Sequence, residues 1–89
     1  MAKKRTKLEV IKDILEVLRK NKEVKITHLI YRSNLSNNSI KPYLEELLKN
    51  GLIQKKDGNG KKSFVILKKG EEFLEEFGKM KLLSEAYGF

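Results

Sequence analysis

The turn Ser33-Asn34-Leu35-Ser36 limits the fold most, because it separates two short segments with helical periodicity. Before it, apolar side chains spaced for one helix face predict a helix over residues 26–33. After it, a second apolar stripe predicts a helix over about residues 37–50. Asn34 suits the end of the first helix because asparagine tolerates left-handed backbone, and Ser36 or Asn37 suits the start of the second. Two helices joined by so short a turn predict a helix-turn-helix.

The flanking segments extend this motif on both sides. Thr6 and Glu9 have the spacing of a capping box and open a first helix. Its core face is expected to hold Leu8, Ile11, Ile14, Leu15 and Leu18, widened by Val10 and Val17. Asn50-Gly51 closes the helix over 37–50, and the stretch DGNG at 57–60 predicts a hairpin turn between strands at 52–54 and 64–67. A last helix follows, so the order predicts a mainly α (α+β), winged helix-turn-helix fold.

Charge is distributed unevenly along the 89 residues, whose formal net charge is +8. Residues 1–69 hold 18 Lys and Arg against 7 Asp and Glu, whereas residues 70–89 hold 2 against 5. A basic body suggests a polyanionic partner, and nucleic acid fits better than an acidic membrane surface. The alternative is a surface rich in lysine and glutamate, as in hyperthermophilic proteins, but that does not predict the asymmetry.

Several classes of function find no support in the sequence. The absence of cysteine excludes disulfides and thiolate metal sites, and the lone His28 is expected to be an ordinary helix residue. We see no paired carboxylates, catalytic triad or phosphate loop, so we expect no enzyme, cofactor, metal or small-molecule ligand. No apolar run approaches the roughly 18 residues of a membrane span, and no signal-peptide core follows the basic start, which predicts an intracellular protein.

Short polar side chains gather at the start of the helix over 37–50. In a helix-turn-helix this end enters the major groove, where Asn37 and Asn38 can pair with adenine and Ser39 with a base or phosphate. Lys41 is expected to reach the DNA backbone. The alternative is that these residues serve only as caps and turns. Pro42 inside the helix would cost about 3 kcal/mol, so we expect the regular helix to begin near Asn38, or to kink.

Basic residues elsewhere supply candidate phosphate contacts. Those of the wing, over residues 55–62, are Lys55, Lys56, Lys61 and Lys62, with Asn59 expected in the minor groove. The alternative for the wing is a solvated hairpin tip. A basic N-terminal arm with Lys3, Lys4, Arg5 and Lys7 either follows the backbone or only aids solubility. Weaker candidates near the helix over 26–33 are Lys25, Thr27 and Arg32.

The last helix carries more apolar surface than one small domain can bury. Its seam steps by four and three residues through Phe73, Phe77, Met80, Ser84 and Tyr87, and Leu74, Leu82 and Leu83 add a second edge. We expect this helix to pair antiparallel with a second copy. The expected contacts are Phe73, Leu74, Phe77, Met80, Leu83 and Tyr87. The alternative is that the helix folds back entirely onto the first helix. If the last helix pairs with a second copy, residues 1–69 form the DNA-binding domain and residues 70–89 form the dimerisation helix.

Two stretches, YLEELLKNGLI and LKKGEEFLEEF, carry a family resemblance over about residues 5–83. The chain resembles the small archaeal winged-helix DNA-binding proteins, which include chromatin-type proteins of about 10 kDa and regulators of archaea and their viruses. The resemblance implies homodimers joined through the C-terminal helix, with the third helix and the wing on double-stranded DNA. Carried across, the contacts fall on Asn37, Asn38, Ser39, Lys41, Lys61 and Lys62. Lys68 departs from the family's threonine, and Pro42 stands where many winged helices place a polar contact residue.

These observations predict a homodimeric transcription regulator on double-stranded DNA, in the prokaryotic cytoplasm and associated with the nucleoid. One alternative is an architectural chromatin protein with little sequence specificity. A less expected alternative is a winged helix that contacts other proteins.

Overall fold

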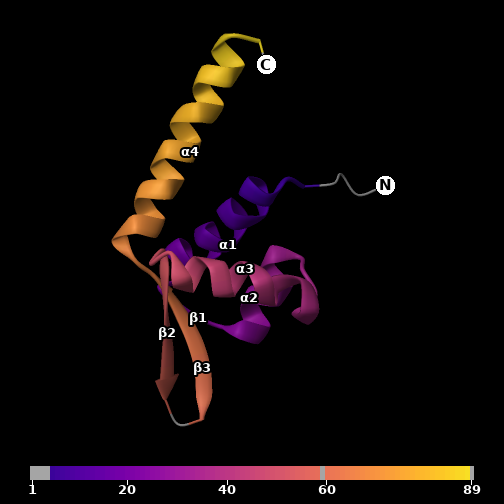
Figure 1. Cartoon of the computed structure of the whole chain (residues 1–89), viewed down its shortest axis with the longest axis vertical. Helices are drawn as coiled ribbons and strands as arrows, with labels where there is room; N and C mark the ends of the chain where they lie inside the picture. Colours follow the sequence, from indigo (N-terminus) through magenta and orange to yellow (C-terminus); the bar gives the residue numbers. More distant parts are fainter. Residues whose placement is uncertain (1–4, 59, 89) are drawn as a thin grey trace.

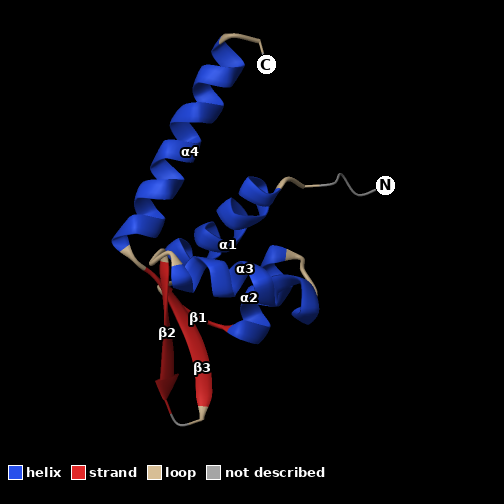
Figure 2. Cartoon of the chain, viewed as in Figure 1, coloured by secondary structure: helices blue, strands red, loops and turns tan. Residues whose placement is uncertain are grey.

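The computed structural model describes residues 5–58 and 60–88. Its elements follow in the order α1 (Lys7–Asn21), β1 (Glu23–Lys25), α2 (Ile26–Ser33), α3 (Asn37–Lys49), β2 (Ile53–Gly58), β3 (Lys61–Ile66) and α4 (Lys68–Ala86) (Figure 1). The predicted winged helix-turn-helix is confirmed, with one short strand, β1, that the sequence analysis missed. The first three helices cluster at one end of the sheet, the β2–β3 hairpin projects from them, and α4 extends the other way (Figure 2).

Helix α1 begins as predicted with the capping box of Thr6 and Glu9, in which each residue's side chain accepts a bond from the other's backbone N–H. Ile11, Ile14, Leu15 and Leu18 are buried. The prediction for Leu8 was wrong, because its side chain is 50% exposed while Val10 is buried instead. The core face of α1 is therefore turned toward Val10 in its first turn.

The turn between α2 and α3 has the predicted local chemistry. Asn34 ends α2 with left-handed backbone (φ 58°, ψ 44°), and Ser36 caps α3 by accepting a hydrogen bond from the Ser39 N–H. The expected later start of α3 was wrong, because the helix begins at Asn37 and Pro42 is its sixth residue. Since proline has no N–H, the Asn38 carbonyl lacks its usual helical donor. Asn38 is exposed, so water can bond that carbonyl.

The wing belongs to a three-stranded antiparallel sheet of order β1-β3-β2, not to a two-stranded hairpin. Residue 24 pairs with Phe64, and Gly58 pairs with Lys61. This register leaves only positions 59 and 60 between β2 and β3, so both strands run further toward the tip than predicted. The helices cover one sheet face, on which Val24, Ile53 and Phe64 join the core with residues of α1, α2 and α3.

Helix α4 packs on α1 near its own start and then leaves the core. Leu74 is buried in the core, Phe73 is half-buried against it, and the Phe73 and Phe77 rings stack with centroids 6.2 Å apart. The second half of the helix extends beyond the other elements (Figure 1). Exposed apolar side chains there are Met80, Leu82, Leu83 and Tyr87. The helix therefore does not fold back entirely onto α1. No helix in the described ranges is long and apolar enough to cross a membrane.

Candidate nucleic-acid interface

The N-terminal turn of α3 presents two amide side chains to solvent. Asn37 and Asn38 are exposed, and within residues 5–58 and 60–88 neither side-chain amide forms a hydrogen bond. Ser39 differs, because its hydroxyl accepts a 2.8 Å hydrogen bond from Ser36 Oγ. Of the three predicted base contacts, two are therefore free to bond an outside group, while the third is held in the helix cap.

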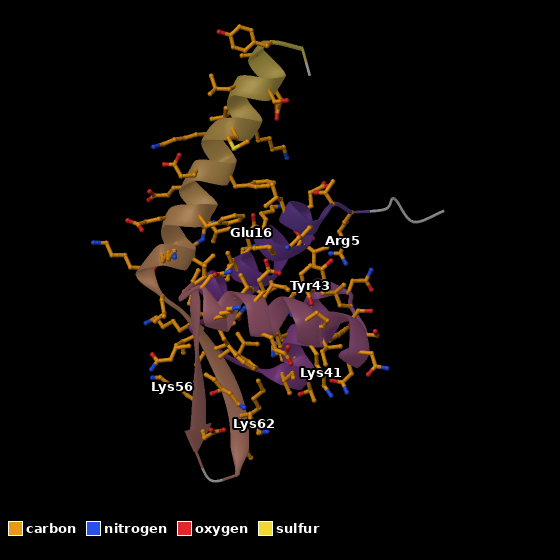
Figure 3. The ribbon with its side chains drawn as sticks, in the orientation of Figure 1. Arg5, Glu16, Lys41, Tyr43, Lys56 and Lys62 are labelled. Atoms are coloured by element: carbon orange, nitrogen blue, oxygen red, sulfur yellow. The ribbon has the colours of Figure 1, made fainter. Side chains whose placement is uncertain are left out.

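Lys41 lies on the same helix and points into solvent (Figure 3). It forms no ion pair within the described part of the chain, so its charge is unmatched there. Tyr43 is half-buried and packs against the core, which makes it a packing residue. The exposed surface of α3 thus combines amide and ammonium groups, whose N–H groups can donate hydrogen bonds to base edges and to phosphate oxygens.

The pairing of the strands divides the wing lysines between two faces of the sheet. Residues directly opposite each other in an antiparallel pair share a face. Lys55 pairs with Phe64, and Lys62 lies two positions from Phe64 along β3. Lys55 and Lys62 therefore lie on the same face as Phe64, which the helices cover closer to the core. Lys56 pairs with Ser63, so Lys56 and Lys61 lie on the opposite face. Figure 3 shows Lys62 on the side of the hairpin toward Lys41 and Lys56 on the other side.

The two faces also differ in their acidic neighbours. Lys62 lies opposite Asp57 across the strands, yet no ion pair within 4.0 Å joins them among the described residues. On the other face Lys25 lies opposite Ser63, whose hydroxyl donates to the Glu23 carboxylate. A hollow there is lined by Glu23, Lys25, Gly58, Lys61 and Ser63. Each face of the wing therefore carries one carboxylate, that of Asp57 on the face of Lys62 and that of Glu23 on the face of Lys61.

Three other basic candidates, two from the N-terminal arm and one from α2, are engaged within the chain. Arg5 bonds Asp13 and the Asn34 carbonyl, so its guanidinium is occupied within the chain. Arg32 donates to His28 and lines a hollow with Asp13 and Glu16, on the α1 side of α2. Lys7 pairs with Glu46 at 2.8 Å. Thr27 is exposed on α2, while Asn59, Lys3 and Lys4 lie outside the described residues.

Side chains that could bind a metal ion do not gather in the described ranges. No group of three or more His, Cys, Asp or Glu side chains there is placed to hold a metal ion. A hollow between α1 and α4 is lined mainly by Leu8, Lys12, Phe77 and Met80. It continues into the exposed apolar side chains of the outer half of α4. Leu74, predicted as a dimer contact, belongs to the chain's own core instead.

Comparison with known sequences gives a family match over nearly the whole chain. Residues 4–85 match the family model described as winged helix-turn-helix. The uncharacterized protein MJ0290 of Methanocaldococcus jannaschii is 38% identical over 73 residues. That alignment covers 82% of this chain and 32% of the relative, so the chain spans about a third of the length of the curated relative it matches.

Comparison with solved structures gives the same fold. Sso10a-2, a DNA-binding protein from Sulfolobus solfataricus, superposes with a TM-score of 0.82 at 25% identity, over 93% of this chain and 85% of that one. BpsR of Bordetella bronchiseptica, whose DNA binding is regulated by 6-hydroxynicotinic acid, gives 0.73 at 16% identity, over 94% and 63%. The likeness to BpsR shows the fold alone.

Proposed function

Because the chain belongs to the winged helix-turn-helix family, we propose that it binds double-stranded DNA as a homodimer and acts as a transcriptional regulator. In this proposal the start of α3 enters the major groove and the β2–β3 wing lies along the backbone. The likeness to Sso10a-2, itself a DNA-binding protein, supports DNA as the partner. The basic balance of residues 1–69 supports it independently.

The observation that carries the proposal is the pair of free amides at the start of α3. Asn37 and Asn38 are exposed and unbonded within the described chain, and the unpaired Lys41 follows on the same helix. An asparagine amide can bond the N6 and N7 groups of adenine at once, which discriminates among bases. These residues therefore favour a sequence-specific regulator.

A second function, an architectural chromatin protein with little sequence preference, is favoured by the wing. Its lysines lie on two faces and attract phosphate whatever the base sequence. Pro42 adds to this, because it occupies the exposed side of α3 with a side chain that cannot read a base. The two functions share the same docking geometry and differ only in whether the amides meet base edges.

The experiment that tests the proposal is a selection from a random duplex pool at ~150 mM salt, where non-specific attraction is already weakened. A regulator is expected to enrich an inverted repeat whose half-sites lie about 10 base pairs apart, one turn of DNA, because dimers place two α3 helices in successive major grooves. Retention of duplexes with no shared motif would support the chromatin role. Failure to retain any duplex would refute DNA binding altogether.

Variants separate base reading from phosphate attraction. We expect Asn37→Ala with Asn38→Ala to lower the preference for the selected duplex over a random one, by about 1–3 kcal/mol for each base that is no longer recognised. The salt dependence of binding should stay the same, because no charge is removed. Ser33→Ala is unsuitable as a control because its buried hydroxyl bonds the Leu29 carbonyl. Asn21→Ala serves instead, because the bond from its amide to the Val17 carbonyl is exposed at the end of α1.

A further inference from the structure

Arg5 joins two parts of the chain that are far apart in sequence. Its Nη1 donates to Asp13 Oδ2 at 2.7 Å, two helical turns along α1. Its Nη2 donates to the backbone carbonyl of Asn34 at 3.3 Å, in the turn between α2 and α3. The Arg5 side chain is 28% exposed, so it is mostly covered while making these contacts. One guanidinium therefore connects the N-terminal segment, α1 and the helix-turn-helix turn.

The Asn34 carbonyl is a sensitive point for the orientation of α3. Asn34 has left-handed backbone, and its own N–H and that of Leu35 already bond back to α2. Its carbonyl accepts a hydrogen bond from Arg5 in the described structure. Ser36, the cap that fixes where α3 begins, is two residues further on. A restraint on this carbonyl is thus a restraint on the direction in which Asn37 and Asn38 point.

Asp13 is itself held in place from the other side. Lys12 Nζ lies 3.3 Å from Asp13 Oδ1 and 3.6 Å from Glu16 Oε1. Burial alone would lower the pKa of Lys12, but the hydrogen bond to Asp13 and the charge of Glu16 outweigh it and raise that pKa above its ordinary value. The ammonium stays charged near neutral pH, and the Asp13 carboxylate keeps a fixed position between Lys12 and Arg5.

We propose that Arg5 is a positioning residue for DNA binding: paired with Asp13, it holds the Asn34 carbonyl and so sets the orientation of the α3 N-terminus, and it does not itself bind phosphate. This inference rests on the proposed DNA-binding function and replaces the sequence-based expectation for Arg5. The pairing decides between the two roles, because Asp13 neutralises the charge that a phosphate contact would use. Arginine suits the task since its planar fork bonds two acceptors at once, which a lysine ammonium does with less geometric control.

Charge and geometry make different predictions for Arg5→Lys and Asp13→Asn, whereas Arg5→Ala weakens binding in both cases. If Arg5 binds phosphate, Arg5→Lys should retain binding and Asp13→Asn should strengthen it, because the protein becomes more positive. If Arg5 positions the turn, Arg5→Lys, Arg5→Ala and Asp13→Asn should all weaken binding, by about two- to fivefold, which is what an exposed ion pair can transmit. Arg19→Ala is the matched control, because it removes one exposed arginine from the last turn of α1.

The test is fluorescence anisotropy of the full chain with a labelled duplex, from ~50 to ~200 mM salt, with thermal unfolding of each variant followed by circular dichroism. Weaker binding by Arg5→Lys and Asp13→Asn, at an unchanged salt slope and below the unfolding transition, is the expected result. A slope lowered by about 0.9 in Arg5→Ala, or tighter binding by Asp13→Asn, would overturn the proposal in favour of a phosphate contact. Lower thermal stability with unchanged affinity would also overturn it, because the pair would then be structural only. Failure of the unmodified chain to bind any duplex would refute the proposed function instead.

Discussion

At the scale of single residues, the capping box of α1 links stability to pH. The Thr6 N–H donates to the Glu9 carboxylate at 2.9 Å, and this bond, followed by that of the Thr6 hydroxyl, lowers the Glu9 pKa below its ordinary value of 4.5. A lowered pKa in the folded state means that the charged carboxylate stabilises the fold above pH 4.5. The contribution is lost as the pH falls through the lowered pKa.

We expect Glu9→Gln to remove this part of the pH dependence. The amide oxygen of glutamine can still accept the Thr6 N–H, but it does not titrate. The difference in free energy of unfolding between the natural chain and Glu9→Gln should therefore be largest above pH 4.5 and shrink below it, as measured by urea unfolding. Glu75→Gln, an exposed change on α4, controls for the loss of one negative charge. A difference that is equal at every pH would contradict the prediction.

Residues with local tasks were predictable from sequence, and residues with distant partners were not. Thr6, Asn34 and Ser36 were predicted correctly because capping depends on the next few residues. The contacts of Arg5 were not predictable, because its partners, Asp13 and Asn34, are brought to it only by folding. Lys22 has φ 60° without being glycine or asparagine, and nothing in the sequence signals it.

At the scale of elements, the missing side chain of Gly70 lets the first turn of α4 pack closely against Leu52, the residue just before β2. A Cβ at Gly70 would lie 2.5 Å from the Leu52 carbonyl oxygen and 2.8 Å from Ile66 Cγ1. The Leu52 carbonyl already accepts the Leu67 N–H at 2.9 Å, so it is not free to move. Lys69 also bonds the Asn50 carbonyl here, which ties the end of α3 to the start of α4. The glycine of the LKKGEEFLEEF stretch, on which the family resemblance partly rests, thus has a packing reason.

We expect Gly70→Ala to lower the free energy of unfolding by about 1–3 kcal/mol or more, because the methyl group overpacks against backbone. Gly78→Ala is the matched control on the same helix, since a Cβ there meets nothing within 4 Å. That variant should instead gain about 0.8–1.0 kcal/mol from the better helix propensity of alanine. Urea midpoints at equal m-values measure both changes. Equal stability of the two variants would disprove the close approach.

The strand β1 shows why part of the sheet escaped prediction. Its three residues, Glu23–Lys25, contain one buried side chain and no periodicity. They form a strand only because β3, some 40 positions further along the chain, pairs with them. The same non-local pairing sets which wing lysines share a face, so the sequence supplied the lysines but not their grouping.

We expect the two lysine pairs of the wing to differ in DNA binding. Lys55 and Lys62 lie on the sheet face toward the helices, whereas Lys56 and Lys61 lie on the opposite face. Changing Lys55 and Lys62 to alanine should weaken binding to every duplex and lower the salt slope by about 1.8, because two phosphates are no longer neutralised. The double alanine variant of Lys56 and Lys61 removes the same charge and should change the slope less. Equal salt slopes for the two double variants would contradict the prediction that DNA binds on the sheet face toward the helices.

At the scale of the whole molecule, the chain measures 50 × 33 × 21 Å along its principal axes, and the outer half of α4 accounts for much of that length (Figure 1). Met80 and Tyr87 are 65% and 75% exposed and lie on one side of this helix with Leu83. Leu82 is 69% exposed but lies on the opposite side of the helix. Contacts within the chain therefore leave most of the apolar surface on the outer half of α4 exposed. The proposed homodimer would cover this surface, because a second copy brings the same seam to a self-complementary interface.

We expect Met80→Glu to convert a dimer into a monomer, because antiparallel pairing would bury two new carboxylates near the seam without partners. Leu82→Glu introduces the same group on the opposite side of α4 and should leave the dimer intact. Sedimentation equilibrium over a range of concentrations measures both. Monomers should also bind an inverted repeat about a hundredfold more weakly, since the second half-site is no longer engaged within one complex. A Met80→Glu protein that stays dimeric would place the dimer contact elsewhere, and one that is monomeric yet binds the repeat as tightly would separate DNA binding from dimerisation.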